Sequence, residues 1–274
     1  MGYESEAMEI FLTKNIVKAQ EIADKLNTYN TQRQSIAKRI FLEAVEKINN
    51  ENIQDLSAIV VGGDNWHHGV IGIVASKLTE MYFKPTILIC FEPDGTGKGS
   101  GRSIPGFDLH KALCDCDMYL ERYGGHEMAV GLNVRKEKFD DFKKELCNIA
   151  NLNNIKNFAP VILVDEQIDK KMLSFKAIEE LKLLEPFGEG NKTPQFIYKN
   201  LKIDSIRTLS EGKHIKLSLK DDNIIVNGIG FNMGNIAEDY LIGDKVDIVG
   251  TLEINTFNGQ DSIQINMKDI MKSL

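Results

Sequence analysis

The N-terminal residues 1–51 carry apolar side chains at the spacing of amphipathic helices. From Ile36 to Ile48 an apolar residue recurs at three- to four-residue spacing, and the other face carries the charged or amide side chains of Gln32, Arg33, Lys38, Arg39 and Glu43. A shorter helical pattern precedes it at 16–26. Neither segment has enough apolar surface to form a domain. We therefore expect a long connecting helix that either packs on the next domain or links it to another part of the protein.

Residues 52–157 alternate between short apolar runs and helical patterns. The runs at 56–61 and 85–91 are bounded by glycine or proline, so they are expected to form buried strands. Apolar residues recur at helical spacing over 69–78 and again over 139–149. Strands that alternate with helices predict an α/β domain.

A second domain is predicted over 158–274, after an asparagine-rich segment and a proline. Residues 161–165 are expected to form a strand. Apolar and polar positions then alternate, most clearly over 213–220, which is the period of a half-buried strand. About five strands with one helix after the third, at 233–240, predict an all-β OB-fold barrel. The sheet face and loops of such barrels bind single-stranded nucleic acid.

Charge and composition limit the possible partners. The chain of 274 residues has a formal net charge of -7, so binding to nucleic acid requires a local basic patch. The four cysteines form no CxxC pair, which favours reduced thiols in a cytoplasmic protein. No apolar segment is long enough to span a bilayer, so no membrane association is expected.

Three polar clusters interrupt the α/β domain. The middle one, residues 100–103, indicates a specific kind of ligand more clearly than the other two. Arg102 offers a rigid fork of donors that matches a phosphate, and adjacent glycines allow close approach of the chain. The hydroxyls of Ser100 and Ser103 can complete such a cradle. A surface ion pair is the alternative for this arginine.

The cluster nearest the end of the domain is Gly124-Gly125-His126. Two glycines allow a sharp turn, and a short helix is expected to follow. Backbone N–H groups at that helix entry, beside an imidazole, would form an anion site. The alternative is an ordinary helix-entry turn with a surface histidine.

The cluster nearest the start of the domain is Trp66-His67-His68, which lies at or just before a helix start. The alternative to a functional role is packing or helix capping beside the tryptophan. Adjacent histidines point in different directions, so no metal site is predicted here.

The three clusters together resemble the DHHA1 domain of the RecJ family, single-strand-specific 5′→3′ exonucleases of the DHH phosphoesterase superfamily. The opening helices also resemble the segment that joins the two catalytic-core domains of that family. Val130 departs from the family, which usually has alanine there, and this is a small packing change. The segments that carry the resemblance are Trp66-His67-x-Gly69-Val70-Ile71-Gly72-Ile73-Val74-Ala75-Ser76, Gly99-Ser100-Gly101-Arg102-Ser103 and Gly124-Gly125-His126-x-x-Ala129-x-Gly131.

The resemblance implies roles for the residues of these segments. Arg102, with Ser100 or Ser103, would hold the 5′-terminal phosphate of the strand. His126, on its glycine turn, would contact a substrate phosphate beside the metal centre.

Trp66 and His67 would shape the inner wall of the same cleft. The metal centre itself would lie elsewhere, because the family holds Mn or Mg in an N-terminal domain with an Asp-His-His motif. This chain has no Asp-His-His, and no set of ligands for two metal ions about 3.5–4 Å apart can be assembled from it. We therefore expect no cofactor in this chain, an N-terminal DHH domain as its partner, and no activity from the chain alone.

In the barrel, Lys213, Lys216 and Phe257 are candidates for binding the strand, and Tyr198 and His214 are further aromatic candidates for base stacking. Base stacking on an aromatic ring contributes about 1–3 kcal/mol per base. Phe196 is expected in the core, and outward lysines are often merely solvated. The resemblance implies single-stranded DNA as the ligand of this domain.

The sequence thus predicts the C-terminal part of a RecJ-like hydrolase that acts in DNA repair and recombination. Two alternatives remain open. One is a nucleic-acid or nucleotide-binding module without chemistry. The other is part of a DHH-family phosphodiesterase that acts on short oligonucleotides or cyclic dinucleotides, although such enzymes commonly end at the glycine–histidine domain.

Overall fold

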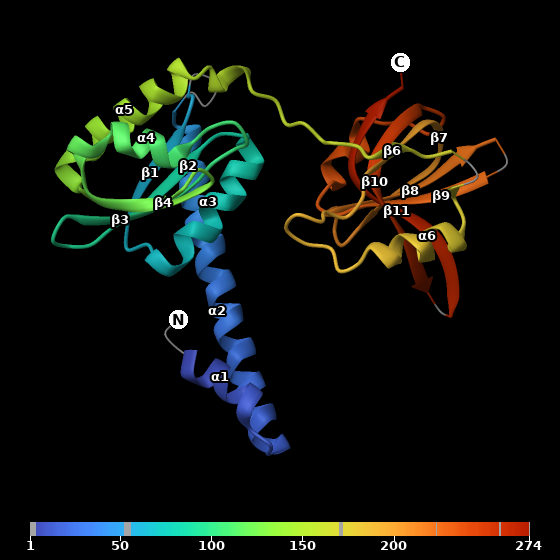
Figure 1. Ribbon diagram of the computed structural model, residues 1–274, viewed down its shortest axis with the longest axis horizontal. Helices are drawn as coiled ribbons and strands as arrows, with labels where there is room; N and C mark the ends of the chain where they lie inside the picture. Colours follow the sequence, from blue (N-terminus) through green and yellow to red (C-terminus); the bar gives the residue numbers. More distant parts are fainter. Residues whose placement is uncertain (1–3, 52–55, 170–171, 223, 258, 274) are drawn as a thin grey trace. The chain divides into compact units, whose positions relative to one another are not determined.

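The computed structural model describes residues 4–51, 56–169, 172–222, 224–257 and 259–273 (Figure 1). The chain divides into two compact units, Met1–Pro160 and Val161–Leu274. Each unit has its own hydrophobic core, so the two are described separately.

The first unit opens with helices α1 (Glu4–Leu12) and α2 (Ile16–Asn49). Asn15 caps α2, because its side chain accepts hydrogen bonds from two backbone N–H groups of the first turn. The sequence suggested a shorter helix before the long one, but α2 is continuous, since neither glycine nor proline occurs within it. Its C-terminal half packs on α3 and β1. The long helix therefore lies against the domain that follows it.

A five-stranded sheet forms the centre of this unit, in the order β1-β2-β3-β5-β4. The first two strands are parallel and the remaining pairs are antiparallel. The strands are β1 (Ile59–Asp64), β2 (Thr86–Phe91), β3 (Thr96–Arg102), β4 (Leu120–His126) and β5 (Ala129–Arg135). The helices beside them are α3 (His68–Tyr82), α4 (Leu109–Asp115) and α5 (Phe139–Leu152), with 3₁₀ turns η1 (Asp117–Tyr119), η2 (Lys136–Lys138) and η3 (Ile155–Asn157).

The two faces of the sheet have separate cores. Helices α4 and α5 cover one face, where Val130, Leu132 and Val134 of β5 pack against Phe142 and Leu146 of α5. Helices α2 and α3 lie on the other face. The α/β fold predicted for this unit is confirmed.

The prediction of a short helix after Gly124-Gly125-His126 is wrong. These residues end β4, which turns directly into β5 as an antiparallel hairpin. Apolar residues alternate with small or polar ones along β5, and this period of two favours a strand. Gly125 has φ +140°, and a Cβ there would lie 2.2 Å from the carbonyl oxygen of Ala129, so glycine is required. The glycine-to-helix anion site proposed for this segment is therefore absent.

The second unit is a closed five-stranded barrel in the order β7-β8-β9-β11-β10, closed by pairing between β10 and β7. One 3₁₀ helix, η6, follows the third strand, as expected for an OB fold, and this prediction is confirmed. The strands are β7 (Phe196–Leu209), β8 (His214–Asp221), β9 (Ile224–Gly230), β10 (Lys245–Phe257) and β11 (Gln260–Lys272). The remaining elements are β6 (Glu166–Gln167), α6 (Phe175–Leu181), η5 (Lys182–Leu184) and η6 (Gly234–Glu238).

The strand expected at 161–165 does not form. Val161 and Leu163 are about four-fifths exposed, at 78% and 81%. Only β6, just beyond them, pairs with β7. An apolar run becomes a strand only where a partner edge is available, and the neighbouring sequence cannot reveal that partner.

Trp66 joins α2 to the sheet, since its indole Nε1 donates a hydrogen bond to Glu43 Oε2 at 2.6 Å. We predict that Glu43→Ala lowers the unfolding free energy of the first unit by about 1–2 kcal/mol, because a buried N–H loses a charged acceptor. Trp66 is the only tryptophan of the chain, so its fluorescence during urea unfolding reports on this unit. The control is Glu46→Ala, at an exposed position one turn further along α2. Equal losses in both variants would show that the hydrogen bond does not anchor the helix.

Candidate nucleic-acid interface

The face of β3, β5 and β4 that lies opposite α5 carries three rows of side chains in register. Residues directly opposite one another in antiparallel strands point to the same face. Cations occupy the two outer rows, and small residues occupy the middle one. The rows are Arg102–Ala129–His126, Ser100–Gly131–Gly124 and Lys98–Asn133–Arg122.

This face is only partly covered. Helix α3 packs chiefly on β2 and β3, so the same face of β5 and β4 remains open. A hollow of about 470 Å³ lies there, with His68 and Ile71 of α3 on one side and Lys98 and Arg122 among its lining residues. The glycines of the middle row form its floor. We call this hollow, together with the three rows, the open groove.

Arg102 lies half-buried at one end of the open groove. Its Nη1 donates to the Ser100 hydroxyl at 3.2 Å and to the Gly101 carbonyl at 2.7 Å. Gly72 of α3 faces these groups, since a Cβ there would lie 3.0 Å from Ser100 Oγ and 3.1 Å from Arg102 Nη2. Among the described residues Arg102 forms no ion pair with a carboxylate. The alternative of a surface ion pair therefore does not apply in the described part of the chain.

His126 is exposed at the end of the same row. Its Nδ1 accepts a hydrogen bond from the backbone N–H of Met128 at 3.3 Å, which fixes the ring against the hairpin turn. Nε2 forms no hydrogen bond with the described residues. The register thus brings His126 and Arg102 to one row, as their proposed common ligand requires.

Two predicted site residues have structural positions instead. Ser103 is buried, and its hydroxyl donates to the Phe107 carbonyl at 2.6 Å, so it closes a turn and cannot cradle a phosphate. Trp66 is buried beneath α2, stacked on Gly63 and bonded to Glu43, so it does not form a wall of the open groove. Sequence alone could not reveal these positions, because Trp66 is held by Glu43, which is distant along the chain, and the turn from Ser103 to Phe107 has no recognisable pattern.

His67 is the N-cap of α3, where its Nδ1 accepts a hydrogen bond from Gly69 N–H at 3.1 Å. The ring of His68 stacks on it, with centroids 5.2 Å apart. The expectation that the two rings diverge is therefore wrong. His68, rather than His67, lines the hollow.

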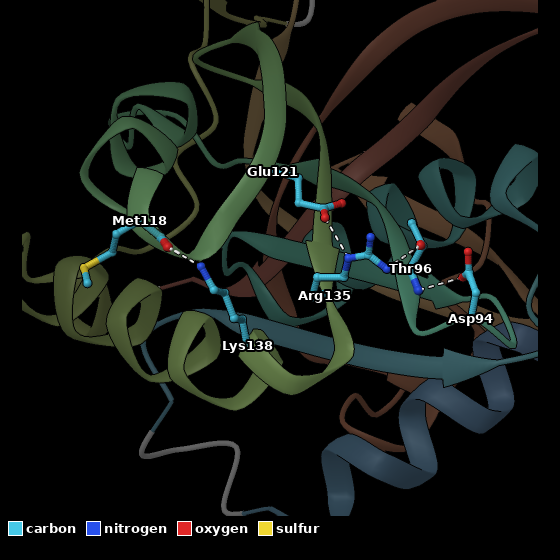
Figure 2. Close-up of polar contacts among 6 residues, drawn as sticks. All are labelled: Asp94, Thr96, Met118, Glu121, Arg135 and Lys138. Carbon is cyan, nitrogen blue, oxygen red and sulfur yellow. Dashed lines mark hydrogen bonds and ion pairs between the residues drawn. The ribbon is translucent and has the colours of Figure 1, made fainter.

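A polar network lies around the Thr96–Arg135 pair, the next same-face pair beyond Lys98–Asn133 on β3 and β5 (Figure 2). Arg135 Nε pairs with Glu121 at 2.7 Å, and its Nη1 donates to the Thr96 hydroxyl at 3.2 Å. The Thr96 N–H donates in turn to Asp94. Because Glu121 stabilises the guanidinium, the pKa of Arg135 rises above its ordinary value. This arginine and this carboxylate neutralise each other, so the positive charge of the groove lies in the rows beyond them.

The same figure shows how the hairpin is anchored on its other side. Lys138 Nζ donates to the Met118 carbonyl at 2.8 Å, which ties the start of α5 to the turn before β4. The Asp117 carboxylate in that turn raises the pKa of Tyr123 to about 12, and this ring packs on the α5 face. Tyr123 therefore gives only its backbone to the open groove.

Sequence reasoning missed Lys98, Arg122 and Asn133. Lys98 could have been identified from the sequence, because Lys98, Ser100 and Arg102 alternate along one strand with period two. Arg122 and Asn133 join them only through the strand register, and an isolated arginine or asparagine carries no signal of its own.

The barrel carries a second hollow, of about 460 Å³, on the outer side of β8, β9 and β11. Lys216 lines it beside Phe231, whose ring lies edge-on to that of His214 with centroids 5.4 Å apart. Phe231 is 54% exposed. We call this surface the barrel groove. Sequence reasoning gave no role to Phe231, because it ends an apolar run at 224–231 that the sequence predicts as a strand.

The other candidates of the barrel have varied positions. Lys213 lies in the turn before β8, outside the barrel groove. The side chain of Phe257 lies outside the described residues. Phe196 is buried in the core as expected. Tyr198 is also buried, and its hydroxyl donates to Asp221 at 2.8 Å.

The described residues contain no group of three or more His, Cys, Asp or Glu side chains placed to hold a metal ion. The open groove offers cations, imidazoles, a hydroxyl and an amide, and its rows and lining residues include no carboxylate, which does not fit the oxygen ligands that Mg2+ prefers. No step of metal chemistry is therefore assigned to these residues. No described helix has the length and apolar character needed to cross a membrane.

Comparison with known families matches both units. The DHHA1 domain family matches residues 55–152, and the RecJ OB domain family matches residues 164–269. The single-stranded-DNA-specific exonuclease RecJ of Bacillus subtilis is 32% identical over 266 residues, which cover 96% of this chain and 34% of that protein.

Its counterpart from Escherichia coli is 28% identical over 97% of this chain and 48% of that protein. The crystal structure of RecJ in complex with Mg2+ from Thermus thermophilus superposes with a TM-score of 0.80 at 28% identity, over 98% of this chain and 41% of that one. This chain is homologous to the C-terminal part of RecJ. It spans between a third and a half of the length of the RecJ proteins it matches. The DHHA1 match lies in the unit with the open groove, and the RecJ OB match lies in the unit with the barrel groove.

Gly72 offers a test of the Arg102 geometry. We predict that Gly72→Ala displaces the guanidinium from Ser100, because the new methyl group meets the flexible end of the side chain rather than the backbone. The unit should remain at least as stable, since alanine is about 1 kcal/mol more favourable than glycine within a helix. The NMR signal of the Arg102 Nε–H group and thermal unfolding by Trp66 fluorescence measure the two effects. The control is Ile73→Ala, at an exposed neighbouring position. An unmoved Arg102 signal would contradict the packing described here.

Proposed function

We propose that this chain is the strand-binding part of a RecJ-like exonuclease and that the Arg102 row holds the 5′-terminal phosphate of single-stranded DNA. The observation that carries the proposal is the Arg102 guanidinium itself. It is half-buried, held by Ser100, free of described carboxylates, and in one row with His126. A half-buried cation without an anionic partner favours an anionic ligand, and the planar fork matches phosphate oxygens.

The overall charge of the chain strengthens this argument. With a net charge of -7, the chain as a whole repels nucleic acid, so attraction must come from local groups. Arg102, Lys98 and Arg122 supply three cations on one face. Phosphate contacts of this kind provide affinity that falls with salt and does not depend on base sequence.

The barrel groove is the proposed path for the bases that follow. OB folds bind single strands through a positive groove and aromatic rings on which bases stack. Lys216 supplies a positive charge, and Phe231 supplies an exposed ring. We further propose that a DHH domain supplies the divalent metal ions and the hydrolytic step, so this chain alone binds but does not cleave. The match to the RecJ OB domain favours this proposal over a phosphodiesterase that lacks a barrel.

We predict that Arg102→Ala weakens binding of a 5′-phosphorylated oligonucleotide by about tenfold to hundredfold, which corresponds to about 1.5–3 kcal/mol for a charged hydrogen bond. Binding of the same strand with a 5′-hydroxyl should change little. Fluorescence anisotropy with both strands, at several salt concentrations, makes the comparison. Arg33→Ala on α2 removes one arginine at a distant site and controls for net charge. An equal loss for both strands would contradict a terminal-phosphate site at Arg102.

A separate prediction concerns the barrel groove. Phe231→Ala should weaken binding of longer strands by about 1–3 kcal/mol, because one base loses its stacking partner, while the preference for a 5′-phosphate persists. The control is Phe175→Ala on α6, which removes a partly exposed ring away from that groove. Anisotropy with strands of increasing length provides the measurement. Unchanged affinity for long strands would exclude Phe231 as a stacking platform.

A further inference from the structure

The open groove contains a second set of anion-binding groups beyond the Arg102 row. Lys98 on β3 and Arg122 on β4 flank Asn133 on β5, and all three pair in register. The Asn133 amide can donate a hydrogen bond between the two cations. These three side chains line the hollow itself, whereas Arg102 and His126 lie in the row at its edge.

None of these groups is used within the described structure. Lys98 and Arg122 are exposed, and neither forms an ion pair with a described carboxylate. The nearby carboxylate of Glu121 is already neutralised by Arg135 (Figure 2). Two cations on either side of β5 that lack counter-charges repel each other, so an anion between them is favoured.

The floor of the hollow permits close approach. Gly124 and Gly131 are adjacent in register, and neither places a side chain above the sheet. A Cβ at Gly124 would meet no atom within 4 Å, so the space above it is open. A glycine pair within a sheet weakens it, which is consistent with a site where a ligand approaches the backbone.

We propose that Lys98, Arg122 and Asn133 form a second phosphate subsite, which binds an internal phosphodiester of the same strand whose 5′-phosphate occupies the Arg102 row. This inference rests on the proposed function for the assignment of the first phosphate. It adds a requirement for strand length, because the two subsites are separated along β3.

The register sets that separation. Lys98 and Arg102 are four residues apart on one strand, which corresponds to about 13 Å at 3.3 Å per residue. The Lys98 and Arg122 backbones are two strands apart, or about 10 Å at 4.8 Å per strand. A mononucleotide carries one phosphate group and cannot reach both rows. A strand of several nucleotides carries phosphates that can occupy both.

The test uses the full chain and a ladder of 5′-phosphorylated oligodeoxynucleotides, from the mononucleotide to about eight nucleotides, a length within the range of known single-strand sites. The variants are Lys98→Ala, Arg122→Ala, the double variant and Arg102→Ala. Lys144→Ala is the charge-matched control, since it is an exposed lysine of α5 on the opposite face of the sheet. Titration calorimetry gives the affinities, and a salt series gives the slope of log K against log salt.

Binding of the mononucleotide should be unaffected by Lys98→Ala and Arg122→Ala, whereas the longer strands should bind about tenfold more weakly to each variant. The salt slope for the longer strands should become shallower by about 0.7 for each lost contact, and by about 1.4 in the double variant. Lys144→Ala should leave the slope unchanged. A mononucleotide that loses affinity as strongly as the longer strands would overturn the inference in favour of a site for free nucleotide phosphate.

Unchanged affinity and slope for all lengths would also overturn the inference. If Arg102→Ala still abolishes the preference for a 5′-phosphate in that case, the proposed function stands and the second subsite alone fails. If Arg102→Ala has no effect while Lys98→Ala and Arg122→Ala weaken only the longer strands, the internal-phosphate subsite stands and the terminal-phosphate assignment fails.

Discussion

The register of β5 between β3 and β4 determines the whole of the open groove. Val130, Leu132 and Val134 pack against α5, and this burial fixes which residues of β5 face the other side. A slip of one residue would bury Asn133 and expose the three apolar side chains, so the alternative register is strongly disfavoured. The cations of the neighbouring strands are aligned through this one central strand. The core on one face of the sheet therefore sets the chemistry of the other.

Glycine in these strands reflects a balance between stability and access. Strand glycines lose conformational entropy and pack no side chain. On β3 they are nevertheless required, since a Cβ at Gly99 would lie 2.8 Å from Leu132 and one at Gly101 would lie 2.7 Å from Val130. On the open side, Gly124 has no such neighbour. Close approach to the backbone of the sheet, rather than packing, explains why this residue is glycine. Glycine thus serves packing on the α5 face at Gly99 and Gly101, and leaves the opposite face open at Gly124.

Much of the fold could be predicted from local patterns, and the groove only in part. The alternation of Ile215, Leu217 and Leu219 was sufficient for a barrel strand, and Ser100 and Arg102, grouped from the sequence, are in contact in the structure. The hairpin at Gly124 was missed because two adjacent glycines resemble a turn and weaken any strand signal. Trp66 and Ser103 were assigned to the cleft because local sequence does not show that they are buried. Trp66 is held by Glu43 of the distant helix α2, and the turn that bonds Ser103 to Phe107 has no recognisable sequence pattern. Lys98, Arg122 and Asn133 form a cluster only through pairing.

The two units carry chemically different surfaces, a cationic groove with a glycine floor and a barrel groove with an exposed ring. Such a pair is suited to a ligand that has both phosphates and bases. The central claim, that the open groove receives the 5′ end of a single strand, is tested most directly by mapping amide NMR shifts of the full chain with a short 5′-phosphorylated oligonucleotide and its 5′-hydroxyl form. The account predicts shifts at Gly124 and Gly131 with both ligands, and shifts around Arg102 and His126 only with the phosphate. Shifts confined to the barrel, or to the α5 face of the sheet, would contradict it.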